Sequence, residues 1–124
     1  MGRVSFRDLV VWQKALDLVE LVYRASDDWP PKETYGLTGQ VRRAAVSIVA
    51  NIAEGHGRTG AKEFLHHLSI ANGSLREVEA QLLVAERLRY LHTPTCEALL
   101  GRTAEVGRLL QGLIKSLRRQ TSTA

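Results

Sequence analysis

The strongest restriction on the fold comes from a row of apolar and small residues that recurs every four or three positions. Its members are Phe64, Leu68, Ala71, Leu75, Val78, Leu82 and Ala85. A spacing that alternates between four and three keeps side chains on one face of an α-helix, and it is typical of helices packed at small crossing angles. The row predicts a helix over residues 61–89, which would be roughly 45 Å long.

Three further stretches have the same helical spacing. The first runs over residues 8–26 with Asp8 as its expected cap, and its apolar residues form two adjacent rows. These rows are Leu9, Trp12, Leu16, Val19 and Tyr23, and Val11, Ala15, Leu18 and Val22. The second stretch begins between residues 35 and 38 and ends near residue 54, with Gly55 as an expected left-handed C-cap. The fourth begins at Thr93 and Pro94, a pair that favours a helix start.

No stretch alternates apolar and polar residues with the period of a strand, and the loops between the four helices are short. We therefore predict an all-α, up-down-up-down antiparallel four-helix bundle as a single domain over residues 1–119. Residues 120–124 carry no large apolar side chain and are expected to form a disordered tail. Gly101, Gly107 and Gly112 interrupt the fourth helix, and we attribute them to close helix packing.

The second helix carries a polar stripe between two apolar faces. At 100° per residue, one narrow arc holds Gln40, Arg43, Ser47, Asn51 and Glu54. One neighbouring arc holds Val41, Ala44, Ala45, Ile48 and Ile52, and the other holds Val46, Val49, Ala50 and Ala53. The apolar surface is about twice as wide as the roughly 100° that a surface helix needs. Copies of the chain are therefore expected to cover one another as a homo-oligomer, and the stripe is interpreted as a structural or interface network rather than a catalytic one.

The overall charge is compatible with nucleic-acid binding but does not require it. Seventeen Lys and Arg against thirteen Asp and Glu give +4. The cations gather in three groups, which are Arg42 and Arg43, Arg58 and Lys62, and Lys115, Arg118 and Arg119. An oligomer would multiply these groups and so favour phosphate binding, although aromatic residues are not interleaved with them and solvated faces are the alternative. A single cysteine and the absence of a membrane-length apolar run predict a cytoplasmic protein.

Several sequence motifs resemble known ligand-binding sites but do not predict such a site in this context. Residues 55–60 match the dinucleotide-binding string G-x-G-x-x-G, but a helix precedes them where a strand is needed. They leave only a helix start flanked by Arg58 and Lys62 as a candidate phosphate site. His66 and His67 are adjacent and therefore project in different directions, and Cys96 lies on an apolar row, so we expect no metal and no cofactor.

Three segments together resemble one family. They are Phe6 to Ala15, Gly36 to Ile48 and Ala50 to Gly55, the last of which contains Asn-Ile-Ala-Glu-Gly. These segments look like the 23S rRNA-intervening-sequence proteins. The resemblance implies an up-down bundle that assembles into a homopentameric ring and, in some bacteria, is encoded inside insertions in large-subunit rRNA genes. Accessory proteins of diversity-generating retroelements are related, and they bind a reverse transcriptase and nucleic acid through a similar pentamer.

The sequence thus predicts a non-enzymatic homo-oligomer that binds RNA or a ribonucleoprotein through the basic groups. A protein-binding adaptor of a reverse transcriptase is one alternative. A helical ribonuclease that uses Arg87 and His92, which match an R-x4-6-H motif that chance also produces, is another.

Overall fold

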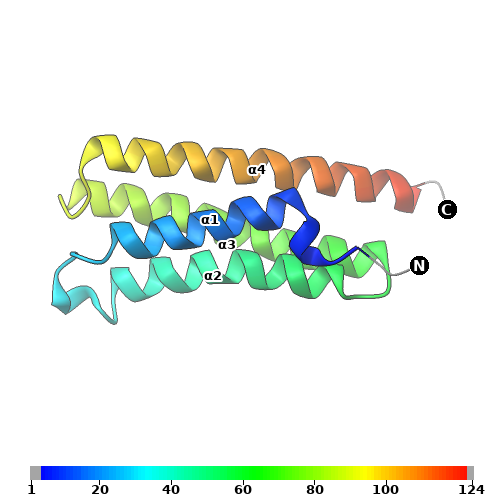
Figure 1. The fold of residues 1–124 in the computed structure, drawn as a ribbon, viewed down its shortest axis with the longest axis horizontal. Coiled ribbons are helices and arrows are strands. Elements are labelled where there is room, and N and C mark those ends of the chain that lie inside the picture. Colours follow the sequence, from blue (N-terminus) through cyan, green and yellow to red (C-terminus); the bar gives the residue numbers. More distant parts are fainter. Residues whose placement is uncertain (1–3, 123–124) are drawn as a thin grey trace.

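The computed structural model describes residues 4–122 and contains four α-helices, with no strand in that range. The helices are α1 (Val10–Ala25), α2 (Leu37–His56), α3 (Ala61–Arg87) and α4 (Thr93–Ser122), and two short 3-10 turns, η1 (Phe6–Asp8) and η2 (Pro31–Glu33), precede α1 and α2. They run up and down side by side as one elongated bundle (Figure 1). The predicted all-α four-helix bundle is confirmed.

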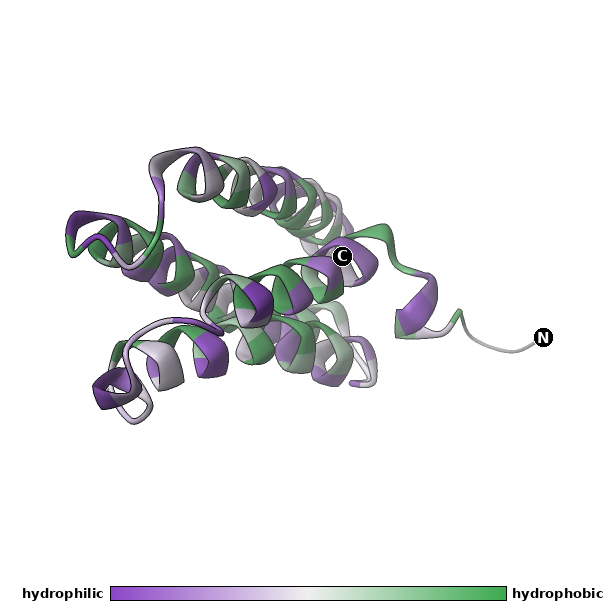
Figure 2. Cartoon of the chain, turned by 60° about the vertical axis from the view of Figure 1, so that its left-hand side comes forward, coloured by the Kyte–Doolittle hydropathy of each residue, from purple (hydrophilic) through white to green (hydrophobic). Residues whose placement is uncertain are grey.

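Each helix packs on its neighbours in the chain, and α1 closes the arrangement against α4. Within residues 4–122, no Cα pair closer than 8 Å joins α1 to α3 or α2 to α4, so these are the diagonal pairs. The surface formed by α1 and α2 therefore lies opposite the surface formed by α3 and α4. Around every helix apolar and polar residues alternate (Figure 2), as expected for helices that each bury one side.

The core consists mainly of aliphatic side chains from all four helices. Its largest fully buried members are Leu18, Ile48, Ile52, Leu68, Leu75, Leu82 and Leu110. In α1 the second of the two predicted rows is the buried one, Val11, Ala15, Leu18 and Val22. The other row lies on the flank beside α2, where Leu16 and Tyr23 remain more than 40% exposed. The helix thus has two apolar sides, of which its own chain covers only one.

The start of α1 differs from the prediction. Leu9 is the N-cap of this helix and makes no side-chain capping bond, whereas Asp8 belongs to η1. Ser5 caps that turn through a bond from the Arg7 N–H to its hydroxyl oxygen. The extra turn places Phe6 edge-on against Trp12, with ring centroids 5.0 Å apart. The aromatic contact accompanies the bend of the chain before α1.

The end of α4 also differs, because the helix continues through Ser122. The sequence predicted a disordered tail from Gln120, and residues 123 and 124 lie outside the described part. No proline or glycine interrupts residues 113–122, and Arg118 and Arg119 suit the negative end of a helix dipole. These features favour the continuation of α4 past Gln120, although residues 120–122 carry no large apolar side chain.

Within the described chain, close helix packing does not explain two of the α4 glycines. A Cβ built on Gly101 or Gly112 would meet no atom within 4 Å, and both residues are exposed. Gly107 is buried, and a Cβ there would lie at an ordinary contact distance of 3.5 Å from Leu75 Cδ2. Within this chain, none of the three glycines is needed for a close approach.

Gly55 is the glycine that does permit a close approach. The sequence placed it at the C-cap, but α2 continues to His56 and the cap is Gly57, which has an ordinary right-handed conformation. A Cβ on Gly55 would lie 2.7 Å from His67 Cβ and 2.9 Å from Phe64 Cδ1. Gly55 therefore lets α2 and α3 approach closely next to the turn that joins them.

Candidate nucleic-acid interface

Part of the predicted polar stripe forms a hydrogen-bonded seam between α2 and α3. The Ser74 hydroxyl donates to Ser47 Oγ at 2.9 Å. The Asn51 amide donates to the carbonyl oxygen and to Oγ of Ser47, at 2.9 and 3.1 Å. The remaining Asn51 oxygen lies 3.2 Å from His67 Nδ1. Each polar side chain at the centre of the stripe thus has a hydrogen-bond partner inside the chain.

The ends of the stripe are arranged differently. Glu54 forms an ion pair of 2.7 Å with Arg58 four residues later. Within the described part of this chain, Glu54 has no ion pair with Arg43, so the expected link between Arg43 and Glu54 of a neighbouring helix stays a prediction. Gln40 and Arg43 line a hollow of about 300 Å³ between α2 and α3, together with Ser74, Glu77 and Gln81. This end of the stripe is open to solvent.

Arg42 is held by α1. Its Nε donates to Ser26 Oγ at 2.9 Å, its Nη2 donates to the Tyr23 carbonyl at 3.1 Å, and its guanidinium lies 4.6 Å from the centroid of the Tyr23 ring. These contacts fasten α2 to the end of α1. Of the first basic pair, Arg43 is the exposed member.

The second and third basic groups lie at the same end of the bundle, beside the turn between α2 and α3 and the end of α4 (Figure 1). Arg58 and Lys62 line a hollow of about 600 Å³ together with Glu63, His66 and His67. Arg58 also borders a smaller hollow, about 270 Å³, whose other walls include Leu117 and Gln120 of α4. The structure thus places two groups of cations that are far apart in the sequence at one end of the bundle.

The third group continues into a groove between α3 and α4. Lys115, Arg118 and Arg119 line a hollow of about 460 Å³ with Gln111 and Ile114. Gln111 also lines the next hollow, about 430 Å³, which includes Arg76, Glu79 and Arg108. We call this surface the α3–α4 groove. Five cations and one carboxylate line it, so it is strongly basic.

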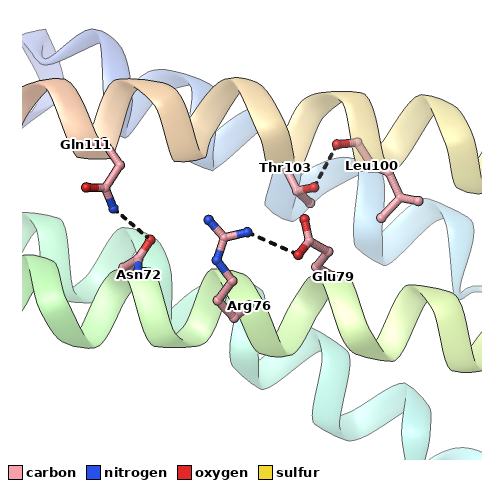
Figure 3. A network of polar contacts seen from close by, with 6 residues as sticks. All are labelled: Asn72, Arg76, Glu79, Leu100, Thr103 and Gln111. Carbon is pink, nitrogen blue, oxygen red and sulfur yellow. Dashed lines mark hydrogen bonds and ion pairs between the residues drawn. The ribbon is translucent and has the colours of Figure 1, made fainter.

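Polar contacts cross and border the groove (Figure 3). Gln111 Nε2 donates to Asn72 Oδ1 over a long distance of 3.5 Å, and Arg76 pairs with Glu79 at 3.1 Å. The Thr103 hydroxyl is satisfied by the Leu100 carbonyl of its own helix, at 2.8 Å. The contacts of Gln111 with Asn72 and of Arg76 with Glu79 are exposed, so they leave the groove accessible to a ligand.

Sequence reasoning missed Arg76 and Arg108. A signal for Arg108 was present, because it stands two helical turns before Lys115 on the same face of α4. Arg76 belongs to a different helix, and only the packing of α3 on α4 shows that it joins the same surface.

Two apolar surfaces remain uncovered. The first, the α1–α2 apolar face, contains Leu16, Tyr23 and Val46, which are 44%, 41% and 40% exposed, with exposed Ala50 and half-buried Val49 and Ala53. The second, the α3 apolar patch, contains Leu83, Val84 and Leu88, which are 47%, 46% and 50% exposed. Val46, Val49, Ala50 and Ala53 are therefore not enclosed by their own chain, as the oligomer hypothesis requires.

The residues of the alternative ribonuclease are exposed and lie at the end of the bundle opposite the basic hollows. Arg87 ends α3 and His92 precedes α4, and no hydrogen bond between them occurs in the described structure.

Cys96 is buried, and burial raises the pKa of its thiol. Residues 4–122 hold no group of three or more potential ligands that is arranged to bind a metal ion. In the same range, no helix combines the length and apolar character of a membrane span.

Comparison with known proteins agrees with this fold. The family model for the 23S rRNA-intervening sequence protein matches residues 7–112. A crystal structure of a protein of unknown function from the S23 ribosomal protein family of Bacteroides thetaiotaomicron VPI-5482 is similar, with a TM-score of 0.77 and 26% sequence identity. The similarity covers 86% of this chain and 99% of that one. No curated protein matches.

The family match spans all of α1, α2 and α3 and most of α4, and it includes the Asn-Ile-Ala-Glu-Gly segment whose asparagine orders the α2–α3 seam. The chain therefore belongs to the 23S rRNA-intervening sequence protein family.

Proposed function

We propose that this chain is a non-enzymatic homo-oligomer, most simply the pentameric ring suggested by its resemblance to the family, that binds RNA or a ribonucleoprotein in the cytoplasm. The observation that carries the proposal is the division of the bundle into two unlike surfaces. The α1–α2 apolar face is one of the two exposed apolar surfaces, and the side of the bundle opposite this face holds the α3–α4 groove with its five cations. The first surface suits contact with another copy, and the second suits phosphates.

The charge distribution supports RNA as the ligand. Residues 108–122 of α4 contain four cations and no acidic residue. Lys and Arg that neutralise phosphates release counterions, which makes binding strong at low salt and weak at high salt. A single chain with a net charge of +4 presents only one such groove. An oligomer presents one groove for each copy, so several contacts form on one RNA molecule.

A structured RNA in an electrophoretic shift assay tests the proposal. Binding is expected at low salt, and its affinity should fall steeply as salt rises. Arg108→Gln combined with Lys115→Gln should weaken binding and reduce the salt slope by about 2, because each lost phosphate contact changes the slope by roughly 0.9 on a duplex. Lys32→Gln is the matched control, since Lys32 is an exposed cation at the other end of the bundle.

Absence of RNA binding at low salt would overturn the proposal. Two outcomes would favour its alternatives instead. A reverse transcriptase or other protein that stays bound after nuclease treatment would indicate an adaptor. Cleavage of RNA that is lost in His92→Ala would indicate the ribonuclease.

A further inference from the structure

The boundary between α2 and α3 is closed by hydrogen bonds along one part and open along another. Ser47 and Ser74 face each other across it, with their hydroxyl oxygens 2.9 Å apart. Toward the start of α2 these two residues border a hollow of about 300 Å³, which we call the α2–α3 hollow. Its long polar side chains, two from each helix, are Gln40, Arg43, Glu77 and Gln81.

None of these four side chains has a hydrogen-bond or ion-pair partner in the described part of the chain. Arg43 and Glu77 have opposite charges and line the same hollow, yet no ion pair joins them. The amide oxygen of Gln81 is buried and accepts no hydrogen bond from residues 4–122. Such an oxygen loses its hydration without compensation. Rotation about the last side-chain bond of Gln81 is easy and turns this oxygen toward the hollow, where a ligand can donate to it.

The charges of the hollow do not suit a phosphate. One cation and one carboxylate line it, whereas five cations and one carboxylate line the α3–α4 groove. A phosphate would be attracted by Arg43 and repelled by Glu77, and it would offer no donor to Gln81. The side chains instead suit an uncharged group that donates hydrogen bonds along one edge and accepts them along another.

The two kinds of partner are provided by different helices. Glu77 and Gln81 are four residues apart on α3, so their side chains are neighbours and their oxygens form an accepting wall. Arg43 provides N–H donors from α2. Its guanidinium lies beside Gly39, where an added Cβ would be only 3.1 Å from Nη1. Gly39 thus leaves room for the donor at the edge of the hollow.

We propose that the α2–α3 hollow binds an unpaired guanine base of RNA. The inference rests on the proposed RNA binding and adds a base contact to the phosphate contacts of the α3–α4 groove. Guanine donates from N1–H and from both hydrogens of its N2 amino group, which matches the two Glu77 oxygens and the Gln81 oxygen. On another edge, its O6 and N7 accept from the fork of an arginine.

The other bases of RNA lack this combination of donors and acceptors. Adenine and cytosine carry an amino group but no ring N–H, and uracil carries a ring N–H but no amino group. A base can present these edges only where it is not paired, as in loops and single strands. Guanine in an unpaired segment is therefore the occupant that satisfies both walls of the hollow.

Fluorescence anisotropy of a short oligouridylate with one central guanosine tests the inference. At low salt, the unmodified chain should bind it about five- to a hundredfold more tightly than the oligouridylate without guanosine, the range expected for a good bidentate base contact. Inosine lacks the N2 amino group, and 7-deazaguanosine lacks N7. Replacing the guanosine by either should remove part of the preference.

Two variants assign each edge of the base to one helix. In Glu77→Gln the difference in affinity between guanosine and inosine should shrink, and in Arg43→Gln the difference between guanosine and 7-deazaguanosine should shrink. Each comparison is made within one protein, so the change in net charge cancels. Glu97→Gln removes an exposed carboxylate of α4 and is the matched control, which should keep both differences.

Equal affinity for all of these oligonucleotides would overturn the inference and leave the proposed RNA binding in place. A guanosine preference that persists unchanged in both variants would place base recognition elsewhere, and the inference would be wrong. If no oligonucleotide binds at low salt, the proposed function is wrong as well.

Discussion

Arg89 has a left-handed backbone conformation, with φ of 64°, in the turn between α3 and α4. The turn ends α3 with two backbone bonds, from the Arg89 N–H to the Glu86 carbonyl and from the Tyr90 N–H to the Ala85 carbonyl. This pattern places Arg89 where helices usually have glycine, because a residue with a Cβ is strained there. The turn is therefore held by its hydrogen bonds at some conformational cost.

We predict that Arg89→Gly raises the free energy of unfolding by about 1 kcal/mol, since glycine removes most of the cost of the left-handed conformation. Urea denaturation followed by circular dichroism measures the change. Arg89→Ala removes the same charge and keeps the Cβ, so it should give no gain. Equal stabilisation by both substitutions would show that charge, not backbone strain, is responsible.

Gly55 and Gly73 provide a comparison of glycines within two helices of the same bundle. Gly55→Ala should reduce the free energy of unfolding by roughly 1–3 kcal/mol, because the new Cβ would overlap His67 and Phe64. Gly73→Ala adds a Cβ where no atom lies within 4 Å, and it should gain up to about 1 kcal/mol from helix propensity. Chemical denaturation of both variants checks the pair. A stabilised Gly55→Ala protein would mean that the helices separate at little cost.

Single positions were the least predictable from the sequence. The helix ends near Gly55 could be located, and a C-terminal cap is the usual role of a glycine there. Whether a second helix lies within contact distance of that glycine depends on the register of α2 against α3, and no local pattern encodes it. Asn51 and Ser47 were correctly grouped, but their partners Ser74 and His67 belong to another helix.

Glu33 joins three elements at the end of the bundle away from the basic hollows. Its Oε1 accepts the Leu37 N–H at the start of α2, at 3.1 Å, and its Oε2 accepts the Tyr90 hydroxyl from the α3–α4 turn, at 2.9 Å. These bonds, first from the Leu37 N–H and then from the Tyr90 hydroxyl, lower the pKa of the Glu33 carboxyl. The same contact raises the pKa of Tyr90.

The lowered pKa predicts how stability changes with pH. The ionised form of Glu33 is favoured in the folded chain, so its contribution is present above the ordinary glutamate range and is lost as pH falls through the lowered value. Glu33→Gln should therefore flatten the acid side of the stability profile, in the range below the ordinary glutamate pKa. Urea unfolding at several pH values measures this. Parallel profiles for the two proteins would show that other carboxylates cause the acid sensitivity.

The helices themselves were largely predictable, because apolar spacing and proline positions locate each one to within a few residues. Less predictable was which side of a helix would face the core. In α1 both apolar rows have the helical period. Only the packing of α1 on α2 and α4 shows that Val11 and Leu18 are buried, whereas Leu16 and Tyr23 lie on the exposed flank. The α3–α4 groove could not be predicted for a similar reason, because Arg76 and Arg108 come from different helices.

The bundle presents two different apolar surfaces, which suits an assembly in which unlike surfaces meet. A closed ring needs such a head-to-tail interface, whereas a two-fold dimer uses one surface twice. The α1–α2 apolar face of one copy and the α3 apolar patch of the next are the candidates. This pairing would use both exposed surfaces in every copy.

We predict that Val46→Glu and Val84→Glu each reduce the mass in solution to that of a single 13.8 kDa chain, because a charge replaces an apolar contact. An equal mixture of the two variants should form pairs through the one intact interface that remains between them. Light scattering measures both masses. Val10→Glu is the matched control, since Val10 is an exposed valine outside both surfaces.

Two results would contradict the head-to-tail arrangement. If only Val46→Glu changes the mass, the contact is two-fold and uses the α1–α2 apolar face twice. If the unmodified chain is already a single 13.8 kDa chain, no assembly exists and the apolar surfaces serve another partner.

Both ends of the described chain emerge beside the turn that carries Arg58 (Figure 1). An affinity tag fused to either end therefore sits next to the hollow that contains His66 and His67. A polyhistidine tag would add further imidazole side chains beside this hollow and so change the chemistry that a ligand meets there. Purification tags should be cleaved before binding is measured, and a fluorophore is better attached near His92, at the far end of the molecule.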